Sequence, residues 1–269
     1  MDLGLAGRAC VITGASSGIG LATARALAGE GARVLLVARD EERLREAASA
    51  ARDSAPASDP AAAVLAIDVT GADAGDRIVT ECVERFGSID VVVNNAGTSR
   101  MSGLDELSDD DWREQLDLHV MAPLRLMRAA APRMADAGWG RIVNVCSSSG
   151  KRPSLSNAAY SVSKAAQLSL SRVFADTYAA RGVLVNAVAP GPVDTPLWLG
   201  EGGLADQAAA AKGSSREEAL EGARAKIPLG RFGTEEEIAS VIAFLCSERA
   251  SDVAGAAWSV DGGSVPTIV

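Results

Sequence analysis

The chain has 269 residues, of which 48% are hydrophobic and 23% charged, and these values predict a single globular domain with a sizeable aliphatic core. Its net charge of −9 argues against nucleic acid and against an anionic membrane as partners, because both would repel an acidic surface. The sequence has no secretory signal, no apolar run of membrane-spanning length and no metal-ligand spacing among its cysteines, so we expect a cytoplasmic protein without a metal site.

Short, continuous runs of Val, Ile and Leu alternate with helical stretches along the chain. The predicted strands are residues 9–13, 34–38, 64–67, 91–94, 142–146, 184–188 and 257–260. The predicted helices are residues 18–30, 41–52, 74–86, 109–133, 158–181 and 235–247. This alternation indicates one α/β domain over residues 1–269: a doubly wound, Rossmann-like parallel sheet of about seven strands with helices on both faces. Ligands bind such sheets beyond the carboxyl ends of the strands.

The junction between the first strand and the first helix is rich in glycine. It reads TGASSGIG over residues 13–20. Glycines let the backbone turn tightly and approach a pyrophosphate, which the helix N-terminus then stabilises. The motif resembles that of the short-chain dehydrogenase/reductase family. The residues predicted to bind a dinucleotide here are Gly14, Ser16, Ser17, Gly18, Ile19 and Gly20.

The end of the second strand predicts which dinucleotide is preferred. A site selective for NAD(H) generally needs an acidic residue here to hold the ribose hydroxyls, and this chain has Ala38 followed by Arg39. A guanidinium suits a 2′-phosphate. We therefore expect Arg39 to favour NADP(H), with NAD(H) possible; the alternative is an arginine on a solvated turn.

The later strands are followed by further segments that resemble the family. Asp68 and Val69 follow the third strand, and an Asn-Asn-Ala-Gly motif ends the fourth. After the sixth strand, residues 186–195 match the family's N-x-x-x-P-G segment, and the matches together run from residue 8 to residue 263. The resemblance implies cofactor contacts by Asp68, Val69, Asn95, Ala96, Gly97, Pro190, Gly191, Val193 and Thr195.

Tyr160 and Lys164 are four residues apart on a predicted helix and therefore share one face. A phenol is a poor base at neutral pH, and a neighbouring ammonium lowers its pKa. Ser147 directly follows the fifth strand, thirteen residues before Tyr160, as in the family's Ser…Tyr-x-x-x-Lys pattern. The resemblance implies that Tyr160 exchanges a proton with a carbonyl or alcohol oxygen, that Ser147 hydrogen-bonds the same oxygen, and that Lys164 tunes Tyr160 and binds the cofactor.

His119 occupies a position where the family usually has an asparagine that supports a water in a proton relay. Pro123 has no N–H and cannot bond the carbonyl of residue 119. We therefore hypothesise that this carbonyl stays free for the water. A further hypothesis is that His119 couples the relay to pH; the alternative is a neutral, sterically accommodated imidazole.

Residues 191–231 form a long segment after the sixth strand and are expected to be a lid over the substrate, or else a surface insertion. We expect an oxidoreductase that transfers a hydride between NADP(H) and a small carbonyl or secondary alcohol. The alternatives are reduction of 3-oxoacyl groups on acyl carrier protein and, remotely, a non-catalytic dinucleotide-binding regulator. Lys151 and Arg152 are either a contact for an anionic tail or a solvated pair. The resemblance also implies a homodimer or homotetramer.

Overall fold

The computed structural model describes residues 2–56 and 61–266. These residues form a parallel sheet of seven strands in the order β3-β2-β1-β4-β5-β6-β7, which confirms the doubly wound prediction. The strands are β1 (Ala9–Thr13), β2 (Arg33–Ala38), β3 (Ala62–Ala66), β4 (Val91–Asn94), β5 (Gly140–Val145), β6 (Val183–Pro190) and β7 (Ala257–Val260). The central strands β1, β4 and β5 are buried along their whole length, as expected for parallel strands that helices cover on both faces.

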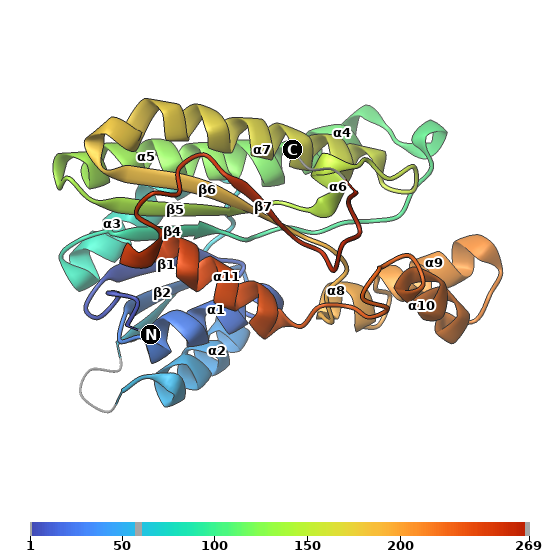
Figure 1. Ribbon diagram of the computed structural model, residues 1–269, viewed down its shortest axis with the longest axis horizontal. Helices are drawn as coiled ribbons and strands as arrows, with labels where there is room; N and C mark the ends of the chain where they lie inside the picture. Colours follow the sequence, from blue (N-terminus) through green and yellow to red (C-terminus); the bar gives the residue numbers. More distant parts are fainter. Residues whose placement is uncertain (1, 57–60, 267–269) are drawn as a thin grey trace.

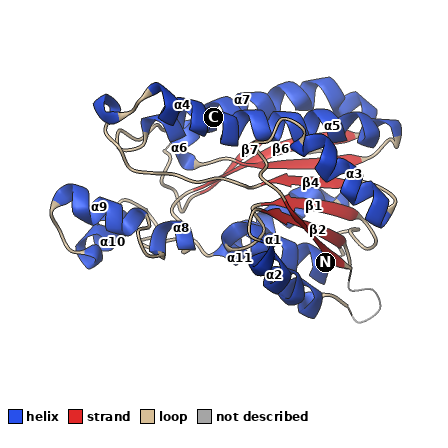
Figure 2. Ribbon diagram, turned by 180° about the vertical axis from the view of Figure 1, so that it is seen from behind, coloured by secondary structure: helices blue, strands red, loops and turns tan. Residues whose placement is uncertain are grey.

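Helices cover both faces of this sheet (Figure 1, Figure 2). One face carries α1 (Gly18–Gly29), α2 (Glu41–Ser54) and α11 (Glu235–Cys246), and the other carries α3 (Ala74–Phe86), α5 (Ala122–Asp136) and α7 (Ala158–Tyr178). Each layer has its own apolar core, and both cores consist almost entirely of aliphatic residues. The parallel strands β1 and β4 are neighbours although β2 and β3 lie between them in sequence, so the strand order reverses here and opens a crevice at their carboxyl ends.

The prediction of one continuous helix over residues 109–133 was wrong. The structure has α4 (Asp109–Leu116), a π-helical turn η2 (Asp117–Met121) and then α5. The N–H of Ala122 donates to the carbonyl of Asp117, one residue further back than in an α-helix. Pro123 follows and has no N–H of its own, so the α-helical ladder is interrupted here. The helix predicted at 158–181 ends at Tyr178, followed by the 3₁₀ turn η3 (Ala179–Arg181) and Gly182 at φ 81°.

The remaining elements lie mostly around the carboxyl edge of the sheet. They are η1 (Leu104–Glu106), α6 (Ser148–Lys151), α8 (Pro196–Leu199), α9 (Leu204–Lys212), α10 (Arg216–Arg224) and, at the opposite edge, η4 (Glu248–Ala250). Figure 1 shows α8, α9 and α10 projecting from the body of the molecule beside the carboxyl ends of the strands. Within the described ranges, no helix is both long and apolar enough to span a bilayer.

Candidate active site

The glycine-rich junction between β1 and α1 forms a cradle into which no side chain would fit. Gly14 has φ +66°, and a Cβ there would lie 2.8 Å from the Cα of Ala96. A Cβ on Gly20 would lie 2.3 Å from the carbonyl oxygen of Gly14. The N-cap residue of α1, Ser17, makes no side-chain capping bond, and the first turn of α1 contains no acidic residue. The free N–H groups of α1 and its positive dipole end thus fit an anionic group such as a pyrophosphate.

A hydrogen-bond network ties this cradle to the end of β4. The Thr13 hydroxyl accepts hydrogen bonds from the N–H groups of Asn95, at 3.0 Å, and Ala96, at 3.1 Å. The Asn95 side-chain amide donates to the carbonyl of Thr13 at 2.9 Å. Thr13 was not among the predicted site residues; a hydroxyl at the last residue of a buried strand, before a glycine turn, was the available signal. This network fixes the two loops on either side of the crevice.

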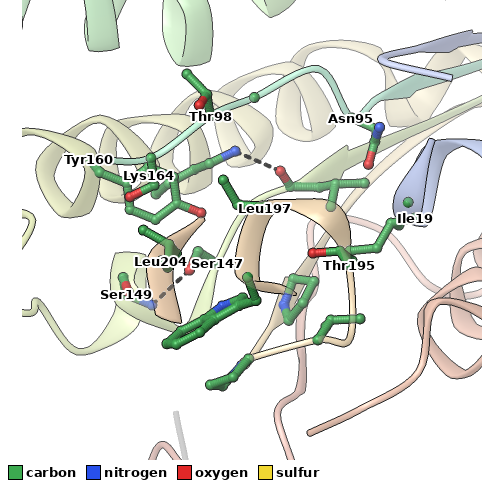
Figure 3. A pocket seen from close by; sticks show the side chains of 18 of the residues that line it. Ile19, Asn95, Thr98, Ser147, Ser149, Tyr160, Lys164, Thr195, Leu197 and Leu204 are labelled. Carbon is green, nitrogen blue, oxygen red and sulfur yellow. Dashed lines mark hydrogen bonds between the residues drawn. The ribbon is translucent and has the colours of Figure 1, made fainter. Parts of the chain in front are cut away.

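Ser147, Tyr160 and Lys164 come together in one pocket at the carboxyl ends of β5 and β6, together with the β1–α1 cradle (Figure 3). Ser147 is the N-cap of α6, directly after β5, and its Oγ accepts the N–H of Ser149 at 3.1 Å. This contact does not use the hydroxyl hydrogen of Ser147, which can be donated to Tyr160 or to a ligand. Tyr160 and Lys164 project from successive turns of α7. Figure 3 shows the hydroxyl groups of Tyr160 and Ser147 directed toward the same part of the pocket.

Burial dominates the acid–base behaviour of this centre. It raises the pKa of Tyr160 to about 12, while the adjacent Ser147 hydroxyl lowers that pKa by hydrogen bonding. Burial also lowers the pKa of Lys164 to about 8. The Lys164 amine donates to the Val145 carbonyl at 2.9 Å. That Lys164, together with a bound oxidised nicotinamide, lowers the pKa of Tyr160 stays a prediction. The phenol is protonated at neutral pH and suited to donate a proton.

His119 is fully buried beside this centre but does not line the pocket. Its ring meets the Tyr160 ring edge-on, with 5.2 Å between centroids. The Thr98 N–H donates to Nε2 at 3.4 Å, so the proton of the neutral ring is on Nδ1, which donates to Ser163 Oγ at 2.9 Å. The Ser163 hydroxyl donates in turn to the carbonyl of Tyr160 at 2.8 Å. Burial and the charge of Lys164 hold the pKa of His119 well below its ordinary value, which opposes a titration near pH 7.

Most of the predicted site residues line the pocket. Those that do are Gly14, Ser17, Gly18, Ile19, Asn95, Gly97, Ser147, Tyr160, Lys164, Pro190, Gly191, Val193 and Thr195. Those that do not are Ser16, Gly20, Arg39, Asp68, Val69, Ala96 and His119. Gly20 and Ala96 instead lie directly against Gly14: a Cβ on Gly20 would lie 2.3 Å from the Gly14 carbonyl oxygen, and a Cβ on Gly14 would lie 2.8 Å from the Cα of Ala96. The Thr70 N–H and hydroxyl both donate to one Asp68 oxygen, and these bonds, with the charge of Arg39, lower the pKa of Asp68.

The segment predicted to be a lid forms one wall of the pocket. Leu197 and Trp198 of α8 and Leu204 of α9 line it, and Trp198 also packs edge-on against Phe232 at 5.0 Å. Across the opening, the Met101 N–H donates to Gln207 Oε1 at 2.8 Å, so α9 is hydrogen-bonded to the loop after β4. Lys151 points elsewhere: its amine donates to the carbonyl of Ala257 and to Ser259 Oγ. Neither Lys151 nor Arg152 lines the pocket.

A sequence model of a protein family matches nearly the whole chain. The model described as enoyl-(acyl carrier protein) reductase, which belongs to the short-chain dehydrogenases/reductases, matches residues 14–265. The chain belongs to the short-chain dehydrogenase/reductase family. It is therefore an oxidoreductase of CH–OH and C=O groups, as the sequence analysis predicted.

Three proteins similar to this chain are named for different substrates. The chain is 35% identical to a 3-oxoacyl-[acyl-carrier-protein] reductase of Thermotoga maritima, over 97% of this chain and 99% of that protein. It is 39% identical to the cis-4-hydroxycyclohexanecarboxylate dehydrogenase of Sinomonas cyclohexanicum, over 98% of both chains. The crystal structure of L-sorbose reductase from Gluconobacter frateurii, complexed with NADPH and L-sorbose, superposes over 100% of both chains with a TM-score of 0.91 and 36% identity.

Proposed function

We propose that this short-chain dehydrogenase/reductase uses NADPH to reduce a small, neutral, hydroxylated ketone to the corresponding alcohol. The observation that carries the proposal is the uncharged polar wall around Tyr160. Ser99, Ser147, Ser149 and Asn157 line the pocket there, facing the apolar residues of α8 and α9. Among the described lining residues, Lys164 is the only charged one. Hydroxyl and amide groups can hydrogen-bond a neutral polyhydroxy chain, whereas the described lining contains no cation besides Lys164 to hold a carboxylate or a phosphate.

In the reduction, Tyr160 donates its proton to the substrate oxygen and Ser147 donates a hydrogen bond to the same oxygen as negative charge develops. When bound, NADPH supplies the hydride. The free end of α1 and the Gly14 cradle would hold its pyrophosphate, and Lys164 would hold the nicotinamide ribose. His119, in its neutral form, would brace Tyr160 through Ser163. The freedom of the residue 119 carbonyl to bind a relay water stays a prediction.

The preference for NADPH rests on the end of β2. Arg39 is exposed there, and it forms no salt bridge with any other described residue. Its guanidinium is thus available for a 2′-phosphate, and the L-sorbose reductase of similar structure contains NADPH. Arg39→Ala should raise the KM for NADPH about tenfold and leave the KM for NADH nearly unchanged. A wild-type protein that uses NADH tenfold more efficiently than NADPH would contradict this preference.

Reduction of acyl groups on a carrier protein remains a second candidate because of the 35% identical relative. The negative charge beside the opening of the pocket argues against a carrier-bound substrate. The first turn of α4 carries Asp109, Asp110 and Asp111, and Asp111 is paired with Arg100 of the pocket-side loop at 2.8 Å. This flank would repel an acidic carrier protein and slow its encounter with the pocket.

The test is the loss of NADPH absorbance with a panel of hydroxy ketones, unsubstituted cyclic ketones, free acyl thioesters and acyl carrier protein thioesters. We expect the highest kcat/KM with a hydroxy ketone. Tyr160→Phe should lower kcat at least 100-fold while NADPH binding persists, because the variant loses only the proton donor. Fastest turnover of the carrier-bound thioester would refute the substrate class. A Tyr160→Phe protein with most of the wild-type rate would refute the mechanism.

We also propose a homodimer or homotetramer in the cytoplasm. The outer sides of α4 and α7 expose Leu116, Val162 and Val173, with 37%, 47% and 58% of their surfaces accessible. Three large aliphatic side chains on neighbouring helices are suited to a self-complementary contact. Sedimentation velocity of the wild type and of a Val162→Glu/Val173→Glu variant tests this. A monomeric wild type at micromolar concentration would contradict it.

A further inference from the structure

Among the residues that the structure describes, Lys164 has two acceptors, and one of them is a side chain that the family pattern did not indicate. Its Nζ donates to the carbonyl of Val145 at 2.9 Å and to Oε1 of Gln167 at 3.0 Å. Gln167 lies three residues further along α7, on the same face, and only 1% of its surface is accessible. An ammonium carries three N–H donors. The two buried acceptors use two of them, so one remains for a ligand in the pocket that Lys164 lines.

We propose that Gln167 is a positioning residue for hydride transfer: its amide oxygen fixes the Lys164 ammonium so that the third N–H faces the cofactor. This inference rests on the proposed function, in which Lys164 binds the nicotinamide ribose. Gln167 acts through Lys164. It does not line the pocket and does not contact the reacting groups.

The surroundings of Lys164 make this one acceptor important. The titratable groups that face the amine are Cys146 at the end of β5, Tyr160 on α7 and His119 on η2. Burial raises the pKa values of Cys146 and Tyr160 to about 12 and lowers that of His119, so all three are uncharged at pH 7. The charged form of Lys164 is consequently stabilised by neutral dipoles rather than by a carboxylate. Val145 contributes a main-chain oxygen, which leaves Gln167 as the acceptor that a substitution can remove.

Two substitutions at this position should therefore have opposite effects on Lys164. Gln167→Met keeps the length of the side chain but removes the acceptor, so the pKa of Lys164 should fall by about one pH unit. Gln167→Glu puts a negative charge next to the amine, so the pKa of Lys164 should rise by at least about one pH unit. A role limited to packing would not give shifts of opposite sign. Ser171→Ala is a matched control, because Ser171 is a buried polar residue one turn further along α7 and its hydroxyl has no hydrogen-bond partner among residues 2–56 and 61–266.

The chain allows a direct measurement, because its lysines are few: Lys151, Lys164, Lys212 and Lys226. Lys212 and Lys226 are exposed and Lys151 is half-buried, so a low titration midpoint distinguishes Lys164. We would label lysine with ¹³C and follow the Cε resonances of the full chain between pH 6 and 11, with Lys164→Arg to assign the signal. The wild type and Ser171→Ala should show one lysine titrating near pH 8. Thermal melts of each variant establish that it is folded.

Binding and turnover provide the second readout. Fluorescence titration with NADPH should show about threefold weaker binding to Gln167→Met at pH 7.5, because the charged fraction of Lys164 falls from about three quarters to about one quarter. The alkaline limb of kcat/KM should move with the NMR midpoint of each variant. If neither Gln167→Met nor Gln167→Glu moves the Lys164 midpoint, or if both move it in the same direction, the role of Gln167 is overturned while the proposed function stands. If the wild type binds no NADPH, the proposed function itself fails, and this result is distinguished from a failure of the Gln167 proposal by the wild-type protein alone.

Discussion

Replacing Thr13 by valine removes one hydroxyl from the junction of β1 and β4 and changes the side-chain shape very little. That hydroxyl accepts two main-chain N–H groups, from Asn95 and Ala96, and donates to the Val93 carbonyl at 3.4 Å. Each buried N–H that loses its acceptor costs about 1–3 kcal/mol. Because both N–H groups are only partly buried, the low end of that range applies, and we expect a loss of about 2 kcal/mol in the free energy of unfolding. The same change should loosen the Asn95 side chain and weaken NADPH binding.

Urea denaturation of the wild type and of Thr13→Val, followed by circular dichroism, measures this loss. Thr23→Val is the matched control, since Thr23 is fully buried in α1 but its hydroxyl makes no hydrogen bond in the described chain. Removing an unpaired buried hydroxyl should leave stability unchanged or raise it by up to about 1 kcal/mol. The two identical substitutions should therefore differ by at least about 2 kcal/mol. Equal stabilities for Thr13→Val and Thr23→Val would refute the account of the junction.

Three further predictions concern pH, the lid and the histidine. The free energy of unfolding should fall above about pH 9.5, measured by urea denaturation from pH 8 to 11, because burial raises the pKa of three thiols from 9.0 to about 12: Cys82, Cys146 and Cys246. The unfolded chain loses these protons at lower pH than the folded chain, so the free energy of unfolding falls by up to about 1.4 kcal/mol per pH unit per thiol. Lys164, with its lowered pKa, raises the free energy of unfolding with pH between about pH 8 and 10.5. A flat profile would contradict the burial argument. Gln207→Leu, which breaks the bond from Met101 across the opening, should lower kcat/KM for the ketone about fivefold with little change in NADPH affinity, and an unchanged kcat/KM would show that this bond does not help close the lid. His119→Asn should lower kcat but leave the shape of the pH–rate profile between pH 6.5 and 8 unaltered, because burial and the charge of Lys164 hold the pKa of the imidazole well below its ordinary value of 6.5. A displaced limb would restore its role as a titrating relay group.

Much of the site could be predicted from the sequence because the fold places it at strand ends. In a doubly wound sheet, each segment that directly follows a strand reaches the same edge, so the residues after β1, β4, β5 and β6 had to meet. The pairing of Tyr160 with Lys164 follows from helical periodicity alone, which the 21-residue helix α7 provides. These features depend on local pattern and chain order, and both can be read without coordinates.

Other features depended on tertiary packing. Local propensity suggested one helix over residues 109–133, but the π-helical turn at 117–121 arises beside Pro123, in a region where α4 and α5 pack against α7. Neither the contact between Lys164 and Gln167 nor the outward direction of Lys151 was evident in the sequence, because long side chains choose among acceptors that distant segments supply. The raised pKa of Tyr160 likewise results from burial in the assembled fold. Spacing along the chain determined which groups meet, whereas the desolvation and hydrogen bonds that set their charge exist only once the sheet and its helices are assembled.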